Sequence, residues 1–494
     1  MANDLVFAGP KNVFILDAQD GKPIQQLLWG DEIVVQQDHG DWLEVEARRE
    51  RGWLRRDRTT PERLLEINFV DVGQGDGAFI VTPDNEFALV DAGAGSNMLR
   101  FLSWRFNLRV GRPGSDPKKV GFKFAVMSHG DEDHYGGFAT LFESPHFSFE
   151  RIYHNTLVQR KAASTAGGLG EREDIQGTAC YTELIRAPED LEKLLAEHPG
   201  DSSKYLQVLK AAGPQRTQGI TALDNYLPGF DQSPRADGRK PLSIEILGPI
   251  PLEAGGRLGL PKLGNTLGES KNGHSIVLLL RYGELRFLLG GDLNTPAENH
   301  LLKQKTKRDA PSENASATEW ADYLAIARKH FGADIAKSCH HGSADFSTTF
   351  LRAINAAATV ISSGDEEPHC HPRPDTLGAI GRHSRGERPC IFSTELMRSS
   401  PEFRSLSPYN SDKIRKLFDE FPAASEKRRK QIGKEIDTLL SAKERVVATY
   451  GMITLRTDGE RVLMAQKLER PRAGGVEFDM HWFSRQGKVL SLDQ

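Results

Sequence analysis

A dense group of metal-binding side chains most constrains what this chain of 494 residues can fold into. His129, Asp131, Asp133 and His134 lie within six residues of one another, directly after the apolar run 122–128. A loop at the end of a strand can turn such side chains onto one or two cations, and imidazole together with carboxylate suits zinc, manganese or iron. A polar surface loop is the alternative, but the strand pattern before the group and the glycine pair after it favour a metal site.

Three further segments carry candidate groups at expected strand ends. Asp292 closes the pattern 286–292 and could bridge two cations, or it could cap the helix expected after it. His340 and His341 follow a strand expected over 334–339. Because adjacent side chains diverge, one of them should bind metal, with His340 preferred, while the other contacts substrate or donates a proton. Asp91 ends an earlier strand and could brace the metal-binding loop through hydrogen bonds.

Two more histidines admit alternative interpretations. His274 stands just before an apolar strand pattern and could complete the first metal position or touch the scissile group, or it could be a hydrogen-bonded structural residue. His371 has a proline beside it, which favours a loop over the site. Cys339 is expected to be a small buried residue rather than a ligand.

Strand and turn patterns divide the chain into three parts. Residues 1–60 contain short apolar runs punctuated by glycines, which predicts a small β-barrel, and residues 55–62 predict a polar linker. Residues 64–400 alternate strand and helix patterns, with a mostly helical insertion expected over about 155–240. Residues 401–494 predict a charged helical pair over 408–446 and a closing β-hairpin turned at Asp458-Gly459.

The composition is that of an ordinary globular protein, with 27% charged and 38% hydrophobic residues. A formal net charge of −4 shows no global basic excess, so a polyanion would need a local basic patch or a bound metal. The first residues lack a signal-peptide pattern and the apolar runs are too short to cross a bilayer, which predicts a cytoplasmic protein. Four cysteines without a C-x-x-C pair predict reduced thiols.

The order of these motifs resembles the metallo-β-lactamase superfamily, and within it the soluble domain of the ComEC competence protein and its stand-alone relatives. That branch opens with D-V-G-Q-G-D, present at 71–76, and carries H-x-D-x-D-H-x-G-G, present at 129–137. N-x-x-S-[ILV]-V-L, a strand-ending G-D and H-H-G-S match residues 272–278, 291–292 and 340–343. A late G-H-P has Cys370 in place of glycine. Residues 40–45 and 52–54 resemble the bacterial Src-homology-3-like domain.

The resemblance implies an α/β (α+β) fold, in which an αββα sandwich with helical insertions follows a small β-barrel. It also implies one or two divalent cations, Zn²⁺ or Mn²⁺, with these ligands: His129, Asp131, Asp133, His134, Asp292 and one of the pair His340 and His341, of which the strand end favours His340. Three residues would support the ligands: Asp76, Asp91 and His371. Catalytic roles would fall to four residues: Asp133, His340, His341 and His274. His274 stands where this branch has a small polar residue, which leaves the metal count open.

The favoured function is hydrolysis of phosphodiester bonds in DNA or a nucleotide through a metal-activated water. Candidate phosphate contacts are Arg100, Arg105, Arg109 and Lys337. Hydrolysis of an ester, lactone or thioester at the same site is one alternative, and a non-catalytic binding protein with a degenerate site is another. The barrel is interpreted as a spacer or a docking module for a protein partner, with ligand binding as the alternative. A role in a multi-component bacterial defence system is a further hypothesis.

Overall fold

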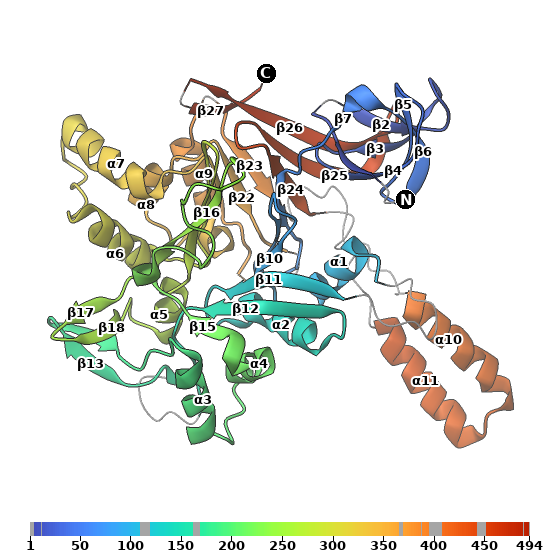
Figure 1. The fold of residues 1–494 in the computed structure, drawn as a ribbon. Coiled ribbons are helices and arrows are strands. Elements are labelled where there is room, and N and C mark those ends of the chain that lie inside the picture. The colour runs from blue at the N-terminus through green and yellow to red at the C-terminus, as the bar shows by residue number, and fades with distance from the viewer. Residues whose placement is uncertain are drawn as a thin grey trace.

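Two large β-sheets form the centre of the computed structural model (Figure 1). The structure describes residues 4–10, 12–108, 119–161, 168–364, 369–386, 388–394, 408–441, 451–487 and 489–493. The first sheet has the order β15-β12-β11-β10-β9-β8-β24-β25-β26-β27. Its strands are β8 (Leu65–Phe69), β9 (Gly77–Val81), β10 (Phe87–Ala92), β11 (Val120–Met127), β12 (Phe147–His154), β15 (Thr217–Gly219), β24 (Ile453–Thr457), β25 (Val462–Arg472), β26 (Val476–Gln486) and β27 (Val489–Leu492).

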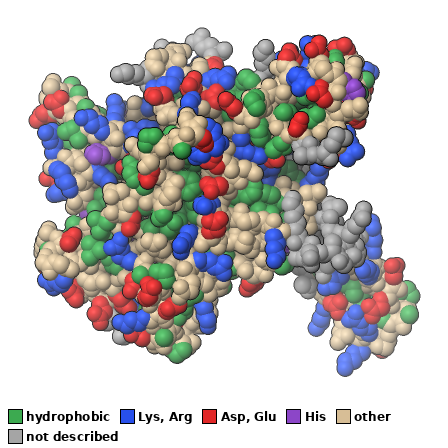
Figure 2. All heavy atoms as spheres, in the orientation of Figure 1, with side chains coloured by type: hydrophobic (Ala, Val, Ile, Leu, Met, Phe, Trp, Pro, Cys, Tyr) green, Lys and Arg blue, Asp and Glu red, His purple; other side chains and the backbone are tan. Residues whose placement is uncertain are grey.

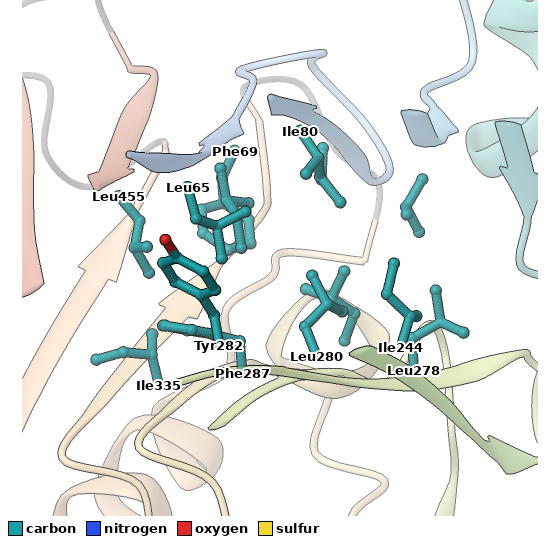
Figure 3. Close-up of a cluster of buried hydrophobic side chains, with 14 of the residues drawn as sticks. Leu65, Phe69, Ile80, Ile244, Leu278, Leu280, Tyr282, Phe287, Ile335 and Leu455 are labelled. Atoms are coloured by element: carbon teal, nitrogen blue, oxygen red, sulfur yellow. The ribbon is translucent and has the colours of Figure 1, made fainter. Parts of the chain in front are cut away.

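The second sheet has the order β16-β19-β20-β21-β22-β23. Its strands are β16 (Leu242–Gly248), β19 (Val277–Tyr282), β20 (Leu285–Leu289), β21 (Ile335–Lys337), β22 (Ala358–Ile361) and β23 (Cys390–Ser393). The two sheets share one hydrophobic core, in which Leu65 and Ile80 of the first sheet face Leu278 and Phe287 of the second (Figure 3). Because side chains alternate along a strand, the neighbours of these residues point to the opposite faces.

Helices cover both outer faces. Phe79, Val81 and Phe122 of the first sheet pack against α1, α2 and α4, whereas Leu279 and Leu288 of the second pack against α6, α7 and α8. The strands are therefore buried on both sides, which explains their nearly continuous apolar sequences. The result is a mixed α+β structure with helix, sheet, sheet and helix in layers. The helices are α1 (Asn97–Arg105), α2 (Glu132–Glu143), α4 (Lys204–Ala212), α6 (Thr295–Thr306), α7 (Ala317–Phe331) and α8 (Thr348–Ile354).

The N-terminal residues form a separate seven-stranded sheet around its own small core. The strands are β1 (Leu5–Ala8), β2 (Val13–Leu16), β3 (Pro23–Leu27), β4 (Glu32–Asp38), β5 (Trp42–Ala47), β6 (Glu50–Arg55) and β7 (Thr59–Thr60). The prediction of a plain linker over 55–62 is wrong in part. β7 lies inside it and pairs with β1, because Thr59 and Thr60 complete the edge of this sheet.

Two other sequence predictions need correction. The segment 155–240 is not mostly helical: besides α3 (Pro188–Glu197) and α4 it contains β13 (Arg172–Ile175), β14 (Thr178–Tyr181) and β15. β13 and β14 join β17 (Leu252–Ala254) and β18 (Arg257–Pro261) in a small sheet. The closing hairpin β24–β25 is extended by β26 and β27, whose residues alternate between polar and apolar and pair in the same sheet.

The charged helical pair is present as α10 (Pro408–Glu420) and α11 (Glu426–Ser441), and it stands away from the sheets (Figure 1). Residues 442–446 of its expected range lie outside the described residues. Among the described residues, no helix is both long enough and apolar enough to cross a bilayer.

Candidate metal centre

The candidate ligands come from strand ends in both sheets. β10 and β11 run parallel in one sheet, and β20 and β21 run parallel in the other. Asp91 lies at the end of β10, His129 two residues after β11, and Asp292 three residues after β20. His341 lies in η5 (Cys339–Gly342), the short 3₁₀ turn that follows β21. Because parallel strands end at a common edge, these loops converge where the two sheets meet.

Four buried residues form the tightest group: Asp76, His134, Asp292 and His341 each offer one ligand atom, and these atoms lie within 4.8 Å of one another. His134 Nε2 and His341 Nε2 are 3.2 Å apart, and each lies 3.1 Å from Asp292 Oδ2. His341 Nδ1 lies 3.1 Å from Asp76 Oδ1. Two imidazoles and two carboxylates turned toward one point can hold a divalent metal ion.

The charges and hydrogen bonds of this group fit a cation. Within the described residues, Asp292 Oδ1 is buried without a hydrogen-bond partner, so it has a lone pair to give. Burial alone would lower the pKa of His341, but the carboxylates of Asp292 and Asp76 outweigh burial and raise this pKa to about 10. Burial is likewise outweighed at His134, whose pKa Asp292 and Asp91 raise well above its usual value. The site therefore has an excess of negative charge, which a bound cation would neutralise.

Hydrogen bonds hold the candidate ligands in place. His134 Nδ1 lies 2.8 Å from Asp91 Oδ2, and Asp91 Oδ1 accepts a hydrogen bond of 2.7 Å from the Ser128 backbone N–H. His341 Nδ1 lies 3.1 Å from the Ser362 carbonyl oxygen, to which a protonated Nδ1 donates. Such partners fix the ring orientation of a metal ligand. Asp91 thus occupies the bracing position that the sequence indicated.

The backbone at the site adopts a conformation that most residues avoid. Asp91, His340 and His341 have φ values of 58°, 47° and 52°. Left-handed conformations of residues other than glycine are uncommon and cluster at functional sites. In η5 this conformation separates the adjacent rings: His341 is buried, whereas the side chain of His340 is 25% exposed. The geometry therefore favours His341 over His340, the histidine preferred from the sequence, as the metal-binding residue.

Asp133, His340 and His371 surround the group of four without joining its tightest part. Asp133 Oδ2 lies 3.6 Å from His341 Nε2, and the carboxylate is 18% exposed. His340 Nε2 lies 4.0 Å from Asp292 Oδ2. The His371 ring is centred 5.7 Å from that of His340 and 6.2 Å from that of His341. These three partly exposed side chains form the rim of the group.

His129 and Asp131 also lie beside the group of four. The buried His129 Nε2 is 3.9 Å from Asp292 Oδ2 and 3.6 Å from Asp131 Oδ2, and it has no hydrogen-bond partner within the described residues. Asp131 directly precedes α2 without a capping hydrogen bond from its side chain, and it forms an ion pair with Lys271 from α5 (Leu267–Gly273). His129 is thus available to a cation, whereas Asp131 already has a charged partner.

His274 is placed away from the metal centre. Its Nε2 lies 2.7 Å from the Pro261 carbonyl oxygen, to which the neutral ring donates a hydrogen bond. Burial lowers the pKa of His274 to about 4, so the ring is uncharged near neutrality. The next residue, Ser275, faces the site instead: its Oγ lies 3.3 Å from His129 Nδ1 and accepts a 3.0 Å hydrogen bond from the Asp292 backbone N–H. The position of His274 therefore fits a hydrogen-bonded structural residue rather than a metal ligand or a substrate contact.

The expected phosphate contacts take other positions. Lys337 is buried and forms an ion pair with Asp76, so it offsets the charge of one carboxylate of the site. Arg105 lies 3.7 Å from Glu66, and Arg100 donates a hydrogen bond of 3.2 Å to Asn97. Arg109 lies outside the described residues.

Sequence reasoning gave Asp76 only a supporting role and missed Ser275, Ser128 and Lys271. The structure places Asp76 in the group of four, and Ser128 Oγ lies 3.1 Å from His129 Nδ1. The N-x-x-S pattern at 272–275 was the available signal for Ser275. No comparable signal exists for Lys271, because a single lysine in a polar segment is normally expected to be a solvated surface residue.

No known protein-family model matches this chain, and no curated protein matches it either. One solved structure, titled "Structure of PhoD", aligns with 99% of this chain and 91% of its own at 9% sequence identity. Its TM-score is 0.18, so this similarity supports no argument about fold or function.

Proposed function

We propose that this chain is a metal-dependent hydrolase of the metallo-β-lactamase superfamily, in its ComEC-like branch, and that it cleaves phosphodiester bonds in DNA or nucleotides. The observation that carries the proposal is the buried group of Asp76, His134, Asp292 and His341, with its atoms within 4.8 Å of one another. The layers of helix, sheet, sheet and helix and the order of the motifs support the superfamily. Zn²⁺ and Mn²⁺ suit this donor set.

Each residue of the site has a distinct task in this proposal. When bound, a divalent cation would lower the pKa of a water molecule and offset negative charge on the reacting oxygen. Asp133 is partly exposed at the rim and can orient the attacking water. His340 is also at the rim and can contact the substrate or the leaving group. Asp91 keeps the His134 ring oriented through its 2.8 Å contact with Nδ1.

A groove on helices that cover the outer face of the second sheet carries three arginines. The groove lies between α7, α8 and α9 (Pro374–His383), has a volume of about 1180 Å³, and is lined in part by Arg328, Arg352 and Arg382. Burial together with the charges of Arg352 and Arg382 lowers the pKa of His383, which indicates positive potential there. Figure 2 shows Lys and Arg side chains gathered over α7 and α8. Arginine suits phosphate, but no residue that lines this groove belongs to the metal centre, so the preference for phosphodiesters rests on the order of the motifs that resemble the ComEC-like branch.

The test is a panel of substrates offered to the protein loaded with Mn²⁺ or Zn²⁺: single-stranded and duplex DNA, RNA, bis(p-nitrophenyl) phosphate and a lactone. We expect cleavage of the phosphodiesters, with Asp133→Asn reducing the rate by about 100-fold or more. Glu132→Gln is the matched control, because Glu132 is the exposed neighbour that pairs with Lys204. Cleavage of the lactone alone would make the ester alternative correct. Metal binding without any hydrolysis would support a binding protein.

A further inference from the structure

Both carboxylate oxygens of Asp131 already accept a hydrogen bond from a side chain of α5, whereas Asp76 Oδ1, within the described residues, is buried without one. Lys271 Nζ forms an ion pair with Asp131 Oδ1, and it also lies 3.3 Å from Gln159 Oε1. With the Asn272 amide turned to match its neighbours, its nitrogen donates a hydrogen bond of 2.7 Å to Asp131 Oδ2. Lys271 is only 16% exposed, so this ion pair is more than a contact on the solvated surface.

We infer that the protein binds a single cation, at Asp76, His134, Asp292 and His341, and that the Lys271 ammonium takes the place of a second cation beside Asp131. The inference deepens the proposed function and rests on its metal centre. It concerns the number of cations in that centre and names Lys271 as the residue that sets this number.

A second cation beside Asp131 would have to share its protein donors with the first cation. Catalytic metal ions usually have three protein ligands. Beside Asp131 the nearest further donors are His129 and Asp292, whose Nε2 and Oδ2 atoms lie 3.9 Å apart, and both can serve the first cation instead. The histidine that could have completed the set, His274, is bonded to the Pro261 carbonyl oxygen, and Ser275 faces His129 in its place.

Electrostatics acts in the same direction. The ammonium of Lys271 neutralises one of the carboxylates that would otherwise attract a second cation. A divalent ion placed against Asp131 would be repelled both by Lys271 and by the ion held at Asp292. Lysine presents a compact point charge, so it can replace a cation in balancing charge without needing a coordination shell.

The measurement is the metal content per chain of the purified protein after equilibration with increasing Mn²⁺ or Zn²⁺. We expect one equivalent for the unmodified protein and for Lys271→Arg, which keeps the charge. Lys271→Met should gain a second, weaker equivalent because Asp131 is released, and Lys271→Met combined with Asp131→Asn should return to one. Lys204→Met is the matched control, because Lys204 pairs with Glu132 on the exposed side of the same loop, and it should remain at one.

Two equivalents in the unmodified protein, or one equivalent in a folded Lys271→Met variant, would overturn the inference while leaving the proposed hydrolase intact. No bound metal at any concentration would overturn the metal centre itself, and the proposed function with it. Circular dichroism of each variant establishes that it is folded. Because metal content is read without any substrate, a wrong choice of substrate class does not affect the result.

Discussion

His340 and His341 carry the same ring on adjacent residues, yet their surroundings differ. Both have left-handed backbone conformations, which turn one ring into the buried group and the other to the rim. The sequence could predict that one of the two binds metal, because adjacent side chains diverge. It could not predict which, because that depends on dihedral angles inside a turn.

The difference predicts opposite phenotypes for two substitutions. His341→Ala should weaken metal binding by at least about 100-fold, because it removes a ring that lies 3.1 Å from Asp292. His340→Ala should leave the metal content unchanged and lower the rate of hydrolysis, because His340 lies at the rim. Equilibrium dialysis with metal analysis measures the first effect, and single-turnover kinetics the second. Loss of metal from His340→Ala with retention in His341→Ala would reverse the assignment.

His274 illustrates the opposite difficulty, since a histidine beside a metal motif attracts a functional interpretation. Its ring instead satisfies the Pro261 carbonyl oxygen inside the protein. We predict that His274→Leu keeps the metal content but lowers the free energy of unfolding at pH 7 by about 1–3 kcal/mol, because this buried carbonyl loses its donor. Chemical denaturation measures the stability. Loss of metal from this variant would show that His274 has a role at the centre.

The same residue predicts a dependence on pH. Burial lowers the pKa of His274 to about 4 in the folded protein, whereas in the unfolded chain it is about 6.5. Between these values the unfolded state binds the proton more tightly, so stability falls as the pH decreases, by on the order of 3 kcal/mol for this group. The difference between His274→Leu and the unmodified protein should therefore shrink from pH 7 to pH 4. Burial also lowers the pKa of His154 to about 4. The stability of both the unmodified protein and His274→Leu therefore keeps the part of its pH dependence that comes from His154.

At the level of elements, the strong apolar runs predicted the central strands well. The run 122–128 corresponds to β11, and the pattern 286–289 corresponds to β20. The strands of the small sheet were not predicted, because β13 has the sequence REDI and three exposed residues, so no apolar periodicity marks it. The loops at strand ends were located because their metal-binding residues are distinctive. Their mutual distances depend on how the two sheets pack, which no local pattern encodes.

Two of these loops touch at Gly75, which has a φ of 101°. A β-carbon there would collide with the backbone carbonyl of Asp133. We predict that Gly75→Ala separates the loop of Asp76 from the start of α2 and lowers metal affinity by about 10- to 100-fold, since supporting contacts of this kind have effects of that size. Isothermal titration with Mn²⁺ measures the change. Gly95→Ala is the control, because open space surrounds Gly95, and an equal effect there would remove the structural reason.

At the scale of the whole molecule, the N-terminal sheet packs directly against the ten-stranded sheet and is not connected to it by a linker alone. Leu28 and Trp29 pack against Leu463 and Phe478 of the ten-stranded sheet. Arg456 of β24 joins the two parts: it lies 2.7 Å from Asp31 in the N-terminal sheet region and 3.0 Å from Glu66 in β8, with all three side chains at most 10% exposed. The sequence marked the boundary but gave no sign of this buried ion group, because its members are far apart in the chain.

This group predicts a large and pH-dependent effect for Arg456→Met. Removing this cation leaves buried Asp31 with Arg48 alone and buried Glu66 with Arg105 alone, so the free energy of unfolding should fall by up to about 3–5 kcal/mol at pH 7. Burial alone would raise the pKa of both carboxyls. At Asp31 the charges of Arg48 and Arg456 outweigh burial and lower the pKa. At Glu66 the charges of Arg456 and Arg105 do the same. Carboxyls of this kind stabilise the fold above their unfolded pKa of about 4 and lose that contribution as the pH falls further. The effect of Arg456→Met should therefore be largest at pH 7 and smaller at pH 3.

Denaturant unfolding at the two pH values tests this, and Arg257→Met is the matched control. Arg257 lies 3.2 Å from Glu173, but these side chains are 63% and 45% exposed, so water screens the pair. Its removal should change stability by less than about 0.5 kcal/mol at either pH. An Arg456→Met effect as small as that of Arg257→Met, or equal at pH 7 and pH 3, would mean that the N-terminal sheet is held by its apolar contacts alone. In that case Leu28 and Trp29, rather than the ion group, would fix its position beside the two central sheets.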